Sequence, residues 1–257
     1  MDGTLLAPDG TVSDRVAAAV RAARGAGIHV VPVTGRPPQA LWSLAAAAGL
    51  GPFGVCSNGA ALVDLDRRQL LEVDHIPGEI AAALVQHARV AEPAIRFAVD
   101  GLDRFSHEAS FFDRPVDWEE DITEVDDLTP VLFAGCIKLI ARRPGLSAAE
   151  LIGRLSPLLG SNVHVTTSGL DWVDIGLVGV TKATALARAC ARLGIEPRDV
   201  IAVGDNHNDL SMIDWAGHGV AVANAVPEVL QAAARVVPSN AGDGVAVLLE
   251  ELLAAAA

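Results

Sequence analysis

Short apolar runs, each followed by a polar loop and an amphipathic helix, occur near both ends of this chain and constrain its fold more than any other feature. Residues 28–33 (IHVVPV) form one such run, and residues 200–203 (VIAV) form another. Strands that alternate with helices build parallel sheets covered by helices on both faces. We therefore predict an α/β fold with a Rossmann-like parallel sheet.

Helix and strand signals around these runs agree with this prediction. Ser13 is a suitable N-cap for an alanine-rich helix that should end near Ala26, between two glycines. A second helix over about residues 39–48 and a short strand over 53–56 are expected next. Near the carboxyl end, a helix over 182–193 should end at Gly194.

The middle of the chain, roughly residues 77–166, has a different character. It holds most of the aromatic residues and an acidic stretch over 113–127, followed by a strand-like run over 136–141. The first pattern then returns at residue 181. A pattern that stops and resumes predicts an inserted domain over 78–166, with residues 1–77 and 167–257 forming the core.

Charge and composition exclude several classes of protein. The net charge of −13 makes nucleic acid an unfavourable partner, because phosphate backbones attract basic surfaces. The apolar runs are too short to cross a bilayer, and we expect neither a membrane partner nor a secretory signal. Three widely spaced cysteines favour a reducing, cytoplasmic setting. Oligomeric state has no signal in the sequence.

The sequence Gly-Asp-Asn-His-Asn-Asp-Leu over residues 204–210 is the most informative polar segment. It follows a predicted strand and places Asp205 and Asp209 four residues apart. Mg²⁺ prefers oxygen ligands of this kind and uses only one or two protein carboxylates. The alternative is a polar surface loop in which Asp209 caps the next helix.

Two further segments could hold a phosphate group. Thr34-Gly35-Arg36 follows the first apolar run, where a hydroxyl and backbone amides at the mouth of a helix suit an anion. Lys182 begins a predicted helix and is one of only two lysines among 19 basic residues. A capping threonine and a solvated lysine are the respective alternatives.

These segments together resemble the haloacid dehalogenase superfamily, and in particular its Cof-like phosphatase branch. The resemblance is carried by the ordered motifs Asp-Gly-Thr-Leu-Leu at 2–6, Thr-Gly-Arg at 34–36, Gly-Val-Thr-Lys at 179–182 and Gly-Asp-x-x-Asn-Asp-Leu at 204–210. Ser57-Asn58-Gly59, residues 219–227 and residues 239–244 resemble the Cof-like branch. The resemblance implies an α+β cap of the C2 type at the inserted domain.

The resemblance also implies a function and a set of roles. It implies a Mg²⁺-dependent phosphatase that forms an aspartyl-phosphate with a small phosphorylated metabolite, such as a sugar phosphate, pyridoxal phosphate or flavin mononucleotide. The implied roles are as follows: Asp2 and Lys182 in catalysis; the Asp2 carbonyl and Asp205 on the metal, supported by Asp209; and Thr34, Gly35, Arg36 and Asn208 in substrate binding. A phosphomutase of the same fold is an alternative that product analysis would separate.

The first family motif is Asp-x-Asp-Gly-Thr, of which this chain carries Asp2-Gly3-Thr4 with Met1 at the variable position. By resemblance, the attacking aspartate would stand one position before Met1, on a strand central in the sheet. A start codon assigned too late is the favoured explanation. A shortened chain and a non-catalytic binding protein are alternatives. We expect the 257-residue chain to have little or no turnover.

Overall fold

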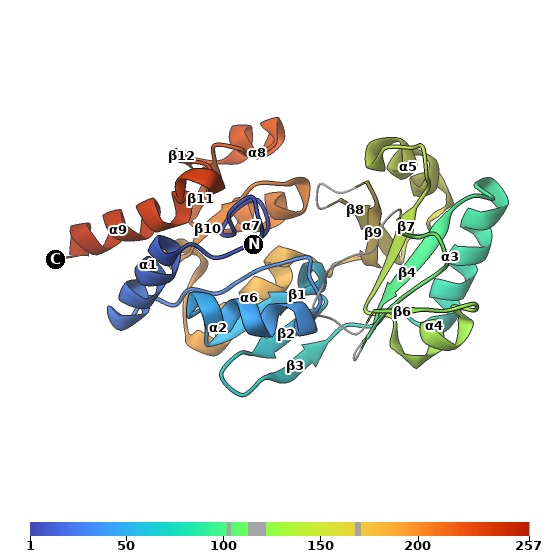
Figure 1. The fold of residues 1–257 in the computed structure, drawn as a ribbon, viewed down its shortest axis with the longest axis horizontal. Coiled ribbons are helices and arrows are strands. Elements are labelled where there is room, and N and C mark those ends of the chain that lie inside the picture. The colour runs from blue at the N-terminus through green and yellow to red at the C-terminus, as the bar shows by residue number, and fades with distance from the viewer. Residues whose placement is uncertain (102–103, 113–121, 168–170, 257) are drawn as a thin grey trace. The chain divides into compact units, whose positions relative to one another are not determined.

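The computed structural model describes residues 1–101, 104–112, 122–167 and 171–256 of the chain. The chain divides into two units (Figure 1). The first is discontinuous and combines Met1–Leu71 with Thr181–Ala257, whereas the second is the continuous segment Glu72–Val180. The acidic stretch noted above falls partly on residues 113–121, which lie outside the described residues.

The amino-terminal part of the first unit contains two helices and a three-stranded sheet, whose first two strands are antiparallel and whose third strand continues into the first residues of the second unit. Ser13 caps the first helix, since its hydroxyl accepts a hydrogen bond from the Val16 N–H at 3.1 Å. The predicted helix over 39–48 begins with a 3-10 turn. The elements are α1 (Asp14–Gly25), η1 (Pro38–Leu41), α2 (Trp42–Ala48), β1 (Phe53–Cys56), η2 (Ser57–Gly59), β2 (Ala61–Asp64) and β3 (Gln69–Val73).

The carboxyl-terminal part of the first unit confirms the α/β prediction. Strands β10, β11 and β12 form a parallel sheet in that order, with Val203 opposite Val220 and Val220 opposite Arg235. The elements are α6 (Lys182–Leu193), η4 (Pro197–Asp199), β10 (Ile201–Gly204), η5 (His207–Asp209), α7 (Leu210–Trp215), β11 (His218–Val222), α8 (Pro227–Ala232), β12 (Arg235–Val237), η6 (Asn240–Gly242) and α9 (Gly244–Ala256). Gly194 ends α6 in the left-handed conformation that the sequence predicts.

The prediction of a full strand over residues 28–33 is wrong. Single bridges join Val30 to Gly51 and Val33 to Val55, and no longer ladder forms among the described residues. On its other side the segment borders a cavity of about 360 Å³, which β10 also lines. A strand needs a continuous hydrogen-bonded partner, and a cavity cannot supply one.

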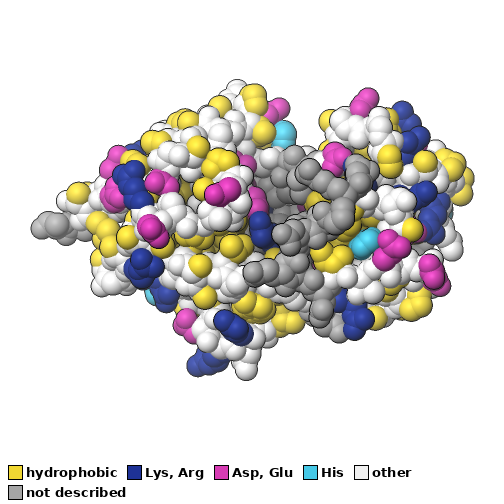
Figure 2. All heavy atoms as spheres, viewed as in Figure 1, with side chains coloured by type: hydrophobic (Ala, Val, Ile, Leu, Met, Phe, Trp, Pro, Cys, Tyr) yellow, Lys and Arg dark blue, Asp and Glu magenta, His cyan; other side chains and the backbone are white. Residues whose placement is uncertain are grey.

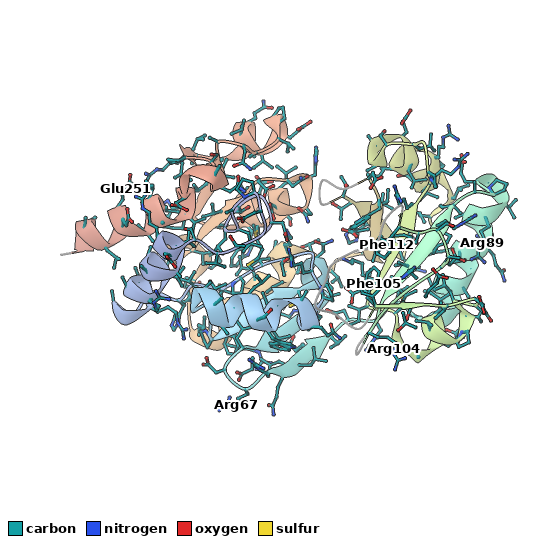
Figure 3. The ribbon with its side chains drawn as sticks, in the orientation of Figure 1. Arg67, Arg89, Arg104, Phe105, Phe112 and Glu251 are labelled. Atoms are coloured by element: carbon teal, nitrogen blue, oxygen red, sulfur yellow. The ribbon has the colours of Figure 1, made fainter. Side chains whose placement is uncertain are left out.

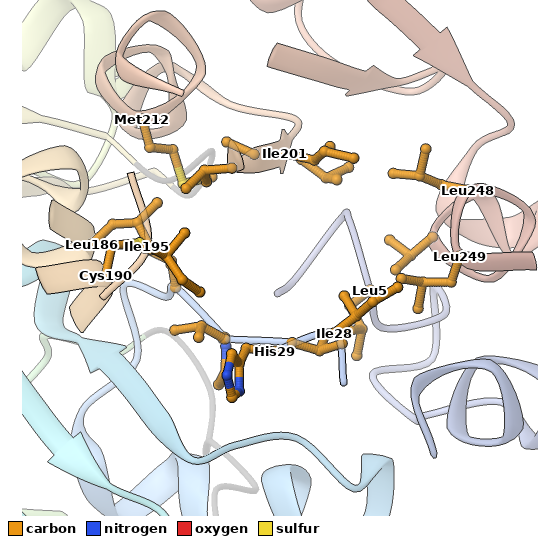
Figure 4. Close-up of a pocket in the computed structure, with 18 of the residues that line it drawn as sticks. Leu5, Ile28, His29, Leu186, Cys190, Ile195, Ile201, Met212, Leu248 and Leu249 are labelled. Carbon is orange, nitrogen blue, oxygen red and sulfur yellow. The ribbon is translucent and has the colours of Figure 1, made fainter. Parts of the chain in front are cut away.

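The lining of this cavity is largely apolar (Figure 4). Leu186 and Cys190 of α6 and Leu248 and Leu249 of α9 point into it from opposite sides. Met1 also lines the cavity. Within the described residues β10 pairs with β11 alone, so one backbone edge of β10 faces this space.

The two chain segments of the first unit are held together by a shared core. Val16, Val20 and Ala23 form the buried face of α1 and pack in one cluster with Val245 and Leu249 of α9. The spacing of these residues on α1 is the three-to-four-residue period of an amphipathic helix. The core therefore joins the beginning of the chain to its end.

The second unit is a six-stranded sheet with order β6-β5-β4-β7-β9-β8, covered by helices on one face. Every neighbouring pair is antiparallel except β5 and β6. Its elements are α3 (Gly78–Ala91), β4 (Arg96–Asp100), β5 (Phe105–His107), β6 (Ile122–Glu124), α4 (Thr129–Gly135), β7 (Lys138–Arg142), α5 (Ala148–Leu155), η3 (Ser156–Leu158), β8 (Val163–Thr166) and β9 (Val173–Leu177).

The limits of this second unit differ from the predicted limits of the inserted domain, 78–166. Strand β9 pairs with both β7 and β8, so the sheet continues past residue 166. On the sheet face opposite the helices, the rings of Phe105 and Phe112 lie 6.2 Å apart (Figure 3). An inserted domain with these exact limits remains a prediction.

The surface side chains and the cysteines add little to the prediction of function. Acidic, basic and hydrophobic side chains are interspersed on the face of the first unit seen in Figure 2. Cys56, Cys136 and Cys190 are buried as free thiols, and burial raises the pKa of Cys136. Over the residues with described positions, no helix has the length and apolar character needed to span a bilayer.

Candidate active site

Polar segments from distant parts of the sequence meet in the first unit, each directly after an apolar or extended segment. Residues 34–36 follow the run 28–33, residues 57–59 follow β1, and residues 205–209 follow β10. Side-chain hydrogen bonds join the amino end of the chain to two of these segments, through Thr4 with Asp205 and Asp2 with Arg36. Open α/β sheets place their ligands beside strand ends of this kind.

Lys182 and Asp209 form a buried ion pair at the centre of this region. The Lys182 Nζ lies 2.6 Å from Asp209 Oδ1, and the two residues are 4% and 3% exposed. Asp209 Oδ2 also accepts the backbone N–H groups of Asp205 and Asn206, at 2.9 and 3.1 Å. Burial is the largest single effect and raises the pKa of Asp209, but the Lys182 ammonium, the Met1 amino group and the backbone N–H of Asp205 together hold the net pKa below the ordinary value.

The contacts of Asp209 bear on the two roles predicted for it, metal support and helix capping. It lies at the N-cap position of α7, but its side chain makes no capping hydrogen bond to that helix. Both carboxylate oxygens are used by Lys182 and by the backbone of the loop. Asp209 therefore fits a role in holding Lys182 and the loop better than direct contact with a metal ion.

Asp205 is the carboxylate best suited to a cation. The Thr4 hydroxyl donates to Asp205 Oδ1, and a Cβ atom added to Gly3 would lie 2.3 Å from Asp205 Oδ2. Gly3 also has a φ of +70°, so this close approach requires glycine. Burial is the main cause that raises the pKa of Asp205, and the Asp209 carboxylate adds to it, so the Thr4 hydrogen bond, the Met1 amino group and Lys182 compensate its charged form only in part.

Asp2 and Arg36 form a bidentate ion pair. Arg36 Nε lies 2.9 Å from Asp2 Oδ2, and Arg36 Nη2 lies 2.6 Å from Asp2 Oδ1. Partial burial is the largest single effect and raises the pKa of Asp2, but the hydrogen bond and charge of Arg36 together with the Met1 amino group bring the net pKa below the ordinary value. The family resemblance implies a substrate-binding role for Arg36 and does not anticipate its pairing with Asp2.

Thr34 is buried at the start of the 34–36 loop. Its N–H donates to the Val55 carbonyl at 2.9 Å, so this amide is not available to a phosphate. Its Oγ1 accepts the Arg36 N–H at 3.1 Å and keeps a hydroxyl proton that can be donated elsewhere. The hydroxyl of Thr34 is therefore the part of this residue that suits an anion.

Two residues that were not among the predicted site residues contribute contacts to the site. Thr4 reaches Asp205, and Asn58 Oδ1 accepts a hydrogen bond from Asn208 Nδ2 at 3.0 Å. Asn58 lies in the Ser-Asn-Gly segment that resembles the Cof-like branch. The position of Asn58 directly after an expected strand was the feature of the sequence that could have indicated a role in the site. The partner, Asn208, is 150 positions away, which no local pattern reveals.

The charges of the site bear on whether it suits Mg²⁺. Among the described residues the site brings three carboxylates, Asp2, Asp205 and Asp209, together with the Arg36 and Lys182 side chains and the Met1 amino group, whose pKa burial lowers. No three His, Cys, Asp or Glu side chains of the described residues converge as a metal-binding group. Mg²⁺ commonly keeps several waters and takes few carboxylates, so the Asp205 carboxylate suits this ion.

Known proteins resemble this chain over almost its whole length. A sequence profile of the haloacid dehalogenase-like hydrolases matches residues 1–249. The chain is 30% identical over 253 residues to 5-amino-6-(5-phospho-D-ribitylamino)uracil phosphatase YcsE of Bacillus subtilis (strain 168), covering 96% of this chain and 90% of that protein. It is 29% identical over 257 residues to pyridoxal phosphate phosphatase YbhA of Escherichia coli (strain K12), covering 96% and 94%.

The fold of this chain is also similar to that of a solved structure over almost its whole length. The crystal structure of a haloacid dehalogenase-like hydrolase from Bacteroides thetaiotaomicron superposes with a TM-score of 0.83 at 26% sequence identity. The superposition covers 98% of this chain and 96% of that one. The similarity therefore includes both units of the chain.

Proposed function

Because the chain belongs to the haloacid dehalogenase-like hydrolase family, we propose that it is a Mg²⁺-dependent phosphatase that acts on a small phosphorylated metabolite. The observation that carries the proposal is the meeting of Asp2, Thr34, Lys182, Asp205 and Asn208 around one region of the first unit. Relatives named for their action on 5-amino-6-(5-phospho-D-ribitylamino)uracil and on pyridoxal phosphate support a small phosphorylated substrate.

The proposed reaction has two steps. By the family resemblance, an aspartate one position before Met1 would attack phosphorus and form an aspartyl-phosphate, while the leaving oxygen would take its proton from Asp2. Water then attacks the aspartyl-phosphate, Asp2 takes its proton, and inorganic phosphate is released. Lys182 and the Thr34 hydroxyl stabilise the charged oxygens of the phosphoryl group, because preorganised donors favour developing negative charge.

The ion pair between Asp2 and Arg36 sets a condition on this reaction. Arg36 holds the pKa of Asp2 low, which suits a base in the second step but opposes the acid role in the first. The first step therefore requires Arg36 to leave Asp2 when the substrate binds. An arriving phosphate is a natural competitor, because guanidinium groups bind phosphate as readily as carboxylate.

Mg²⁺ would be held by Asp205, with the Asp2 carbonyl as a second protein ligand. When bound, the ion would offset the repulsion between the site's carboxylates and the phosphate dianion. Thr4 orients Asp205 for this role through its hydroxyl. Asp209 supports the loop and fixes Lys182.

A survey of phosphate release tests the proposed function directly. The enzyme, carrying an aspartate ahead of Met1, should release inorganic phosphate from pyridoxal phosphate, flavin mononucleotide or a sugar phosphate when Mg²⁺ is present. A chelator should abolish the release. The proposal fails if no phosphomonoester is hydrolysed faster by this enzyme than by its Asp205→Asn variant.

Replacing Asp205 should remove the response of the protein to Mg²⁺ even without substrate. We expect Asp205→Asn to weaken Mg²⁺ binding at least about tenfold, since the charged ligand is lost while the Thr4 hydrogen bond can persist. The increase of melting temperature on Mg²⁺ titration measures this affinity.

Asp214→Asn is the matched control for this change. It removes the same charge from an exposed position in the same unit and should leave the Mg²⁺ response intact. Equal affinities of Asp205→Asn and the unmodified chain would show that Asp205 is not a metal ligand.

A further inference from the structure

The turn at residues 57–59 has an unusual backbone. Ser57, Asn58 and Gly59 have φ values of 50°, 58° and 108°, so three consecutive residues adopt positive φ. This conformation is unfavourable for residues with a side chain and recurs at functional sites, where the surrounding structure enforces it. The reaction described above assigns no role to the turn.

The turn contacts the 34–36 loop and the start of α6. The Asn58 N–H donates to the Thr34 carbonyl at 3.0 Å, and the Ser57 N–H donates to the Arg36 carbonyl at 2.9 Å. A Cβ atom added to Gly59 would lie 2.2 Å from the Thr181 carbonyl oxygen, so the turn packs directly on the residue before Lys182.

The Asn58 side chain makes the third connection, to Asn208. Asn58 Oδ1 accepts one N–H of the Asn208 amide at 3.0 Å. A Cβ atom added to Gly35 would lie 2.9 Å from the same Asn58 oxygen. One buried side chain thus lies between the proposed phosphate loop and the amide of Asn208.

We propose that Asn58 is a positioning residue, which orients the Asn208 amide so that its second N–H is directed at the phosphate. This inference rests on the proposed function of the site. By accepting one N–H, Asn58 fixes the orientation of the Asn208 side-chain amide, and therefore the direction in which its NH₂ group points. Because the Asn208 side chain is already ordered, binding of phosphate to its second N–H costs less conformational entropy.

The identity of the residue agrees with this role. Asparagine tolerates the left-handed backbone better than most residues with a side chain. Glycine would tolerate it too but has no acceptor for Asn208. Aspartate would supply the acceptor but would place a negative charge beside the phosphate. Asparagine meets all three requirements at position 58.

Asn58→Gly tests the proposal while keeping the backbone conformation. We expect the affinity for inorganic phosphate in the presence of Mg²⁺ to fall about five- to tenfold, the effect of losing one oriented hydrogen bond. Isothermal titration calorimetry measures this affinity. Arg68→Gly is the matched control, because Arg68 has a φ of 52° at an exposed turn and should leave phosphate affinity unchanged.

A double-mutant cycle separates positioning from independent contact. If Asn58 acts through Asn208, the pair Asn58→Gly with Asn208→Ala should bind phosphate as weakly as Asn208→Ala alone, within about twofold. The NMR signals of the Asn208 side-chain NH₂ group should also move in Asn58→Gly before any phosphate is added, which general weakening of the fold would not single out.

Each outcome has one meaning. If the unmodified protein binds phosphate but Asn58→Gly binds it equally well, or if the two losses multiply, the positioning role is overturned and the proposed function stands. If the unmodified protein binds no phosphate at all, the proposed function fails and the inference fails with it.

Discussion

An aspartate joined directly to Met1, at the end of a short apolar strand, should raise the rate of phosphomonoester hydrolysis at least about 10³-fold over that of the 257-residue chain. A suitable extension is Val-Leu-Val-Ile-Asp, since a strand buried on both faces is continuously apolar. The rate of phosphate release from p-nitrophenyl phosphate with Mg²⁺ measures the change.

The surroundings of Met1 are the reason for this expectation. Its α-amino nitrogen is buried, and burial, followed by the nearby Lys182 ammonium, lowers its pKa. The carboxylates of Asp209, Asp2 and Asp205 also act on this nitrogen. A residue attached there would begin among the groups that we propose to bind Mg²⁺ and phosphate.

An added strand would run along the cavity beside Met1. The cavity lies between residues 28–33 and the edge of β10, both of which could pair with an added strand. The extension should therefore also raise the melting temperature by several degrees, through new backbone pairing and burial of apolar surface.

The control is the same extension ending in asparagine instead of aspartate. It should raise the melting temperature equally but leave turnover at the level of the 257-residue chain. Equal turnover of the two extended proteins would contradict the assignment of the nucleophile. An unchanged melting temperature in both would show that the cavity does not accept a strand.

Replacing Lys182 by methionine should destabilise the protein by about 3–5 kcal/mol and abolish phosphate binding. Asp209 would then keep a buried negative charge with no cation beside it, whereas it now lies 2.6 Å from the Lys182 ammonium. Urea denaturation measures the loss of unfolding free energy, and calorimetry with inorganic phosphate measures the loss of binding.

A second substitution separates these two effects. Asp209→Asn, added to Lys182→Met, should recover much of the stability, because the neutral amide can still accept a backbone N–H of the loop. Phosphate binding should stay lost, since the ammonium is absent. A stability loss below about 1 kcal/mol for Lys182→Met alone would contradict the account of this buried pair.

The stability difference should also depend on pH. In the unmodified protein the pKa of Asp209 is below its ordinary value, so its ionisation favours the folded state above that ordinary value and ceases to do so as pH falls through the lowered one. In Lys182→Met the remaining burial raises this pKa instead. The difference between the two proteins should therefore narrow as pH falls from 7 towards 4.

Local sequence signals predicted the parts of the fold that depend on local interactions. Ser13 caps α1 and Gly194 ends α6 as expected, because each acts within one turn of its helix. The strand at 53–56 was also correct, and the strand at 200–203 is shifted by one residue. The α/β class followed from the order of these elements.

Predictions that depend on distant partners were less complete. Residues 28–33 have the composition of a buried strand, but strand formation is decided by a neighbour that composition does not identify. The ion pair of Asp2 with Arg36 and the hydrogen bond of Asn208 to Asn58 span 34 and 150 positions. Motif order indicated that these segments meet, but not which atoms would touch.

The division of the first unit between both ends of the chain has a consequence for the order in which the protein can fold during synthesis. The second unit is continuous over Glu72–Val180, so the ribosome completes it before Lys182 and Asp205 are made. Asn58 and Thr4 must wait for Asn208 and Asp205, 150 and 201 positions later, and α1 must wait for α9. The site is thus assembled only when translation is nearly finished, after the intervening unit can already have folded.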